Sequence, residues 1–84
     1  MESHLRRLLD ELSGAIGRTR RHEDREELAR LRGEVESRLE GAGEKQHSGL
    51  VDALGKAEIR FESEHPTLGE ALRDAIEVLS AAGI

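Results

Sequence analysis

Residues 67–82 read TLGEALRDAIEVLSAA, and the spacing of their apolar side chains decides the fold class. These side chains recur at helical spacing and form a broad stripe: Leu68, Ala71, Leu72, Ala75, Ile76, Val78, Leu79 and Ala82. Thr67 and Glu70 have the spacing of a capping box, so we expect the helix to begin near Thr67. A stripe this broad must pack against other apolar surfaces.

Three further segments show helical spacing, at about residues 3–16, 23–40 and 48–63. The second carries a narrow, coiled-coil-like seam formed by Leu28, Leu31, Val35 and Leu39. Polar residues 41–47 and the His65-Pro66 pair separate the later segments, and no strand-like alternation occurs. We therefore predict one all-α domain over residues 1–84, with four amphipathic helices arranged as two helical hairpins in a small bundle.

The chain is in the size range where a single core commonly needs additional support. It has 84 residues and no cysteine, so no disulfide can stabilise it. Ile59 points nearly opposite to the main stripe of its helix, which includes Leu54, Ala57 and Phe61. We expect oligomerisation to complete the bundle, most simply as a homodimer.

Composition disfavours several classes of function. The net charge is −5, and the apolar runs are far shorter than the ~20 residues that span a bilayer. We therefore expect a cytoplasmic protein with no membrane association, and nucleic acid is an unlikely partner. Residues 1–32 nevertheless carry eight arginines against seven acids, and Arg18, Arg20, Arg21 and Arg25 form a basic cluster. A regulator that contacts nucleic acid through Arg18–Arg25 is the weaker alternative.

Glu62 and His65 have the Glu-x-x-His spacing of metal-binding helical bundles, and Glu58 lies one turn earlier. Such sites need further ligands from other helices, and this chain carries one such motif. Pro66 also biases His65 away from helical geometry. We expect no metal here and interpret His65-Pro66 as a turn between helices, with Glu58, Glu62 and His65 as the candidate ligands of an alternative metal- or ligand-binding function.

Residues Phe61-Glu62-Ser63-Glu64-His65-Pro66-Thr67-Leu68 and the terminal Gly83-Ile84 resemble a family of short bacterial proteins, domain-of-unknown-function family 4404. The opening Leu5–Leu12 segment is similar to that family's first helix. The resemblance implies an all-helical fold, and it implies no activity.

No catalytic residue and no cofactor-binding residue can be assigned. The serines lack a glycine-elbow context, and a chain with one Phe and mostly Leu and Ala predicts no shaped pocket. The expected function is therefore non-catalytic, without a cofactor: a homo-oligomeric protein–protein interaction or scaffold module. An unknown protein partner is also possible.

Overall fold

The computed structural model describes residues 2–40 and 47–81, and these residues form four α-helices. They are α1 (Glu2–Arg18), α2 (His22–Leu39), α3 (His47–Phe61) and α4 (Pro66–Ala81). No strand occurs within these two ranges. The predicted all-α fold is confirmed. Ala82 and the terminal Gly83-Ile84 pair lie outside the described residues, as does most of the predicted 41–47 connection.

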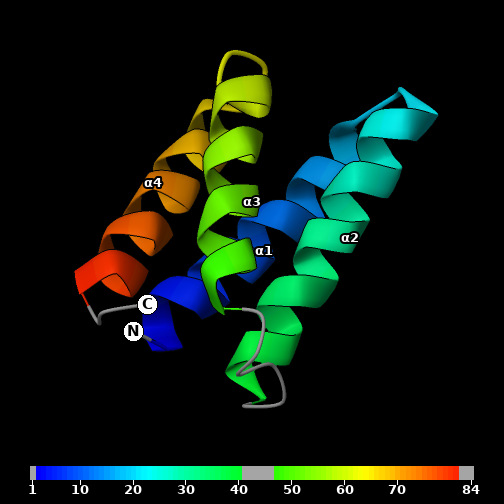
Figure 1. Cartoon of the computed structure of the whole chain (residues 1–84). Coiled ribbons are helices and arrows are strands. Elements are labelled where there is room, and N and C mark those ends of the chain that lie inside the picture. The colour runs from blue at the N-terminus through cyan, green and yellow to red at the C-terminus, as the bar shows by residue number, and fades with distance from the viewer. Residues whose placement is uncertain (1, 41–46, 82–84) are drawn as a thin grey trace.

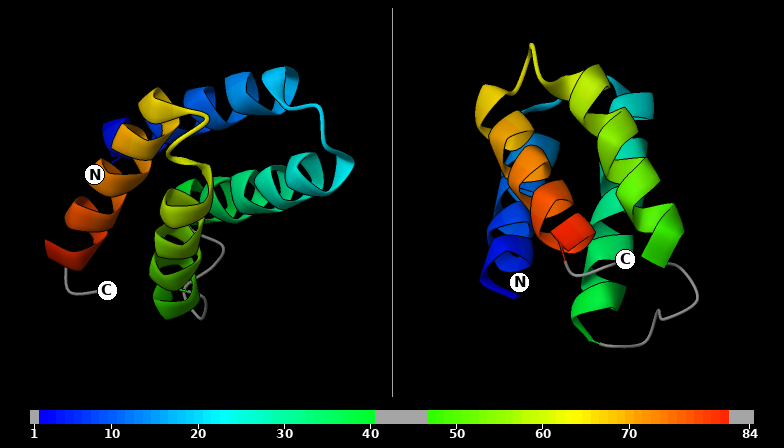
Figure 2. Two further views of the ribbon diagram at one scale, coloured as in Figure 1. Left: turned by 90° about the horizontal axis from the view of Figure 1, so that it is seen from above. Right: turned by 60° about the vertical axis from the view of Figure 1, so that its left-hand side comes forward.

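The helices pack as two hairpins, as predicted. α1 packs against α2 and α4, α3 packs against α4, and the contact between α2 and α3 is the least extensive. The α1–α2 connection and the α3–α4 turn lie at the same end of the molecule (Figure 1). Seen from above, the two hairpins run in different directions (Figure 2). The bundle is therefore closed on the α1–α4 side and more open between α2 and α3.

One hydrophobic core joins all four helices. Its sixteen buried residues are Leu5, Leu8, Leu12, Ala15, Leu28, Leu31, Val35, Leu50, Leu54, Ala57, Phe61, Leu68, Ala71, Leu72, Ala75 and Leu79. The radius of gyration is 11.7 Å, close to the value of about 12 Å expected for a compact chain of this length. A single chain thus buries its main apolar stripes without a second copy.

The start of α4 differs from the prediction. The helix begins at Pro66 and not at Thr67, because the His65 carbonyl accepts the first helical hydrogen bond from Gly69 N–H, at 2.9 Å. Pro66 therefore occupies the first helical position, where its missing N–H costs no hydrogen bond. The predicted capping box at Thr67 and Glu70 is wrong, since Thr67 lies within the first turn.

Other helix ends differ from the predicted limits by one or two residues. α1 runs on to Arg18, α2 begins at His22 and ends at Leu39, and α3 ends at Phe61. Shifts of this size are common at helix ends, where the last turn lacks a full set of hydrogen bonds.

Gly69 allows α3 and α4 to approach closely beside their turn. A Cβ atom at this position would lie 3.1 Å from Cγ, 3.3 Å from Cβ and 3.4 Å from Cα of Glu62. A side chain here would therefore be crowded, chiefly by the Glu62 side chain, and glycine leaves the room that this approach needs. The short turn fixes which residues of α3 and α4 lie side by side.

Candidate functional site

The α1–α2 connection and the α3–α4 turn together form an open pocket of about 390 Å³. It is lined by the segment from Arg18, the last residue of α1, to Arg21, by Asp24 from α2, and by Glu64 and His65 from the turn. We call it the connection pocket. The structure thus brings together the basic cluster and His65, which lie far apart in the sequence. Arg25 is exposed on α2 and is not part of the lining.

The Thr19 side chain joins the two connections. Its hydroxyl lies 2.6 Å from the Ala15 carbonyl, to which it donates, and 3.4 Å from Nε2 of His65. A hydroxyl has one hydrogen, and the shorter bond uses it. The Thr19 oxygen is therefore open to His65 only as an acceptor, which favours the tautomer with its hydrogen on Nε2 and none on Nδ1.

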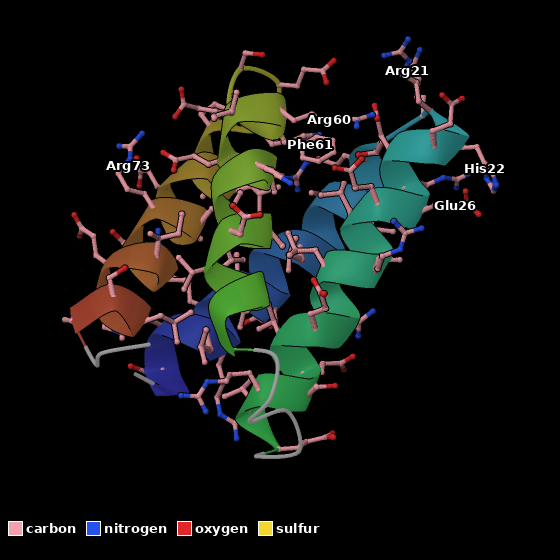
Figure 3. The ribbon with its side chains drawn as sticks, in the orientation of Figure 1. Arg21, His22, Glu26, Arg60, Phe61 and Arg73 are labelled. Carbon is pink, nitrogen blue, oxygen red and sulfur yellow. The ribbon has the colours of Figure 1, made fainter. Side chains whose placement is uncertain are left out.

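Arg60 links α3 to α2 at the same end of the bundle. It donates to Asp24 Oδ1 and to Glu27 Oε1, both at 2.6 Å, and Figure 3 shows it between the two helices. Its guanidinium carbon also lies 5.4 Å from the centre of the Phe61 ring. The hydrogen bond to Asp24, followed by the charge of Glu27, raises the pKa of Arg60 above its ordinary value. Arg60 therefore remains charged and compensates Asp24, which is only 5% exposed.

The candidate metal ligands do not converge. Glu58 accepts a hydrogen bond of 3.0 Å from Arg73 Nε, and Glu62 accepts one of 2.8 Å from Arg73 Nη2. The hydrogen bond and charge of Glu58, with the charge of Glu62, raise the pKa of Arg73. His65 contacts Thr19 instead. No group of three His, Asp or Glu side chains suited to a metal occurs among residues 2–40 and 47–81.

A second pocket, of about 220 Å³, lies between α2 and α3. Leu31, Ala53 and Ala57 supply its apolar surface, and its charged residues are Glu27, Arg30, Glu34 and Lys56. We call it the α2–α3 groove. Ile59, one turn beyond Lys56, is 86% exposed, which confirms that it points away from the core.

Sequence reasoning missed the roles of Asp24 and Thr19. Asp24 has the sequence position of an ordinary exposed acid in the first turn of a helix, yet it is buried at the start of the α2 seam. Its position four residues before Leu28 is the signal that could have shown this. Nothing near Thr19 in the sequence indicates its contact with His65, because the partner lies 46 residues away.

Comparison with known families gives one result. The family described as Domain of unknown function (DUF4404) matches residues 2–84, almost the whole chain. The chain belongs to the DUF4404 family. Neither the curated proteins nor the solved structures gave a match. No helix in the described part of this DUF4404 chain is long and apolar enough to cross a membrane.

The segment that carries the resemblance to DUF4404 proteins builds the α3–α4 turn. Phe61 and Leu68 are buried on either side of it. Glu62 is held by Arg73, His65 contacts Thr19, and Pro66 begins α4. The burial of Phe61 and Leu68, the contacts of Glu62 and His65, and the position of Pro66 thus hold the turn in place.

Proposed function

We propose that this protein is a non-catalytic, homo-oligomeric helical interaction module that acts in the cytoplasm, with a dimer as its simplest form. The observation that carries the proposal is Ile59, a large apolar side chain that is 86% exposed on the outer face of α3. Exposing a single isoleucine is ordinary, so its surroundings decide whether the face suits a partner.

The surroundings of Ile59 suit a second helix. Gly49, Asp52, Lys56 and Ile59 follow one another at spacings of three, four and three, the spacing of a helix–helix seam. All four are exposed in the single chain, and a Cβ atom at Gly49 would meet nothing within 4 Å. Lys56 also lines the α2–α3 groove, so the groove and this seam adjoin.

The charges along the seam favour a second copy of the chain as its partner. Suppose that two α3 helices pair antiparallel, with the twofold axis at the level of residue 54. Asp52 of each copy then faces Lys56 of the other. In the same register, Ile59 of each copy covers the open space at Gly49 of the other. Within one chain Asp52 and Lys56 already form a pair of 3.4 Å, so both are held near the proposed contact. A symmetric dimer requires such self-complementarity.

Light scattering at micromolar concentration tests the proposal, with a dimer expected. Ile59→Lys and Asp52→Lys should each give a monomer. Adding Lys56→Asp to Asp52→Lys should restore the dimer, because opposite charges again face each other. Asp10→Lys makes the same charge change at an exposed position on α1 and serves as the control. A monomer whose melting temperature is independent of concentration would overturn the proposal.

A further inference from the structure

We propose that the connection pocket is an anion site that binds a small phosphorylated molecule. This inference is independent of the proposed oligomer, because the pocket lies at the end of the bundle and not on the α3 seam. It assigns a ligand to the basic cluster of an otherwise acidic protein.

The pocket's arginines are not neutralised by acids in the part of the chain that the structure describes. Arg18, Arg20 and Arg21 all line it, and none forms an ion pair with a carboxylate of the described residues. By contrast, Arg7, Arg60 and Arg73 each bridge two helices through carboxylates. Guanidinium groups without carboxylate partners are well suited to binding phosphate through paired hydrogen bonds.

Two acids, Asp24 and Glu64, also line the pocket. Asp24 is compensated by Arg60, whose Nη2 lies 2.6 Å away, so its charge opposes an incoming anion less than an unpaired carboxylate would. Glu64 is exposed and forms no ion pair with a described cation. The lining therefore carries three arginines against two acids, and Arg60, which it shares with Glu27, neutralises Asp24 in part, so the pocket is net positive. Glu64 then weakens anion binding, which provides a direct test.

The backbone at the start of α2 adds to the positive potential of the pocket. Arg21 is extended there, with φ −75° and ψ 126°, and no side chain caps the helix. The first helical hydrogen bond runs from Arg25 N–H to the Arg21 carbonyl. The N–H groups of residues 22–24 therefore have no acceptor within the helix. Such amides favour an anion, although the acids in the first turn reduce the effect.

Size and composition select the class of ligand. A volume of about 390 Å³ lies in the range of small-molecule sites. The chain has one aromatic residue, and this Phe61 is 1% exposed, so no aromatic surface can stack on nucleic-acid bases. The net charge of −5 also opposes a long polyanion. A small phosphorylated molecule therefore fits better than DNA or RNA.

Titration of the whole chain with inorganic phosphate at constant ionic strength, followed by amide NMR shifts, tests the proposal. Saturable shifts are expected at Thr19–Asp24 and at Glu64–His65. Arg20→Ala should weaken binding about tenfold, as expected for one charge-assisted hydrogen bond. Glu64→Gln should tighten binding about two- to fivefold, because it removes a repulsive charge. A variant that merely damages the fold could not tighten binding.

Arg32→Ala is the matched control, since it removes the same charge from an exposed position of α2 outside the pocket. Equal weakening by Arg20→Ala and Arg32→Ala would overturn the site, because it would show a general charge effect. Shifts spread over the whole chain, or none at all, would also overturn it. A single-stranded 12-mer that binds much more tightly than phosphate, with steep salt dependence, would overturn the small-molecule assignment in favour of nucleic acid.

Discussion

Nε2 of His65 lies 3.4 Å from the Thr19 hydroxyl, and this contact joins the two connections at one end of the bundle. Because Thr19 donates its hydrogen to Ala15, the neutral His65 ring should carry its hydrogen on Nε2. Long-range ¹⁵N–¹H NMR at high pH distinguishes the two ring nitrogens directly. We expect Nδ1 to be the unprotonated nitrogen.

Substitution of Thr19 provides the control for the His65 prediction. Thr19→Ser keeps the hydroxyl and should preserve the tautomer, whereas Thr19→Val removes both hydrogen bonds and should allow the tautomers to mix. A predominant Nδ1–H form in the unchanged protein would contradict the hydrogen-bond direction that we assign.

A second prediction concerns divalent metal. Arg73 engages both Glu58 and Glu62, and His65 faces Thr19, so metal binding would have to break the Arg73 pairs. We expect no change in melting temperature on adding Zn²⁺ or Mn²⁺, in either the unchanged protein or His65→Ala. A clear metal-dependent rise that His65→Ala abolishes would instead establish the site suggested by the Glu-x-x-His spacing.

The pair formed by Asp24 and Arg60 should respond unequally to its two single substitutions. Arg60→Gln leaves a buried carboxylate without its cation, and this is costly because the charge stays desolvated. Asp24→Asn leaves a half-exposed Arg60 that still reaches Glu27. Urea unfolding should therefore show a larger loss for Arg60→Gln, and a smaller effect of that substitution in the Asp24→Asn background. If the two single substitutions cost equal unfolding free energies that add in the double variant, Arg60 does not stabilise the buried charge of Asp24.

Phe61 should be the most sensitive core position. Its ring is 1% exposed and lies where α3 meets the turn into α4. Phe61→Ala should cost about 3–5 kcal/mol in unfolding free energy, a large part of the stability of a domain of this size. Phe61→Leu leaves a smaller cavity and keeps the measurement possible if the alanine variant fails to fold. A loss well under 1 kcal/mol for Phe61→Ala would contradict the burial of the ring.

Helix number and type could be predicted from the sequence because the apolar stripes repeat at helical spacing within each segment. The stripe of α4 is an example: Leu68, Leu72 and Leu79 are all buried as expected. The start of α4 could not be fixed as well, because both Pro66 and Thr67 carry helix-start signals. Either residue is favourable near a helix start. The hydrogen bond from Gly69 N–H to the His65 carbonyl shows that the helix begins at Pro66.

The connection pocket could be predicted from the sequence only in part. Its arginines form a cluster in the sequence, but Glu64 and His65, which complete the lining, lie more than 40 residues away. The Glu-x-x-His spacing likewise suggested a shared site for Glu62 and His65, whereas tertiary packing gives them different partners. Arg73, which engages Glu58 and Glu62, lies on another helix and has no sequence signal of its own.

The last prediction compares two helical glycines that sequence propensity alone would treat alike. A Cβ atom at Gly33, in the exposed middle of α2, would meet nothing within 4 Å, so Gly33→Ala should stabilise the protein by about 1 kcal/mol. At Gly69 the same methyl would lie 3.1–3.4 Å from Glu62, including its backbone Cα, and crowding of this kind costs about 1–3 kcal/mol. We therefore expect Gly69→Ala to lower stability in urea unfolding despite alanine's better helix propensity. Glu62→Ala removes the nearest atom, so Gly69→Ala should cost less in that background. Equal stabilisation by both glycine substitutions would show that the α3–α4 approach is looser than the structure indicates.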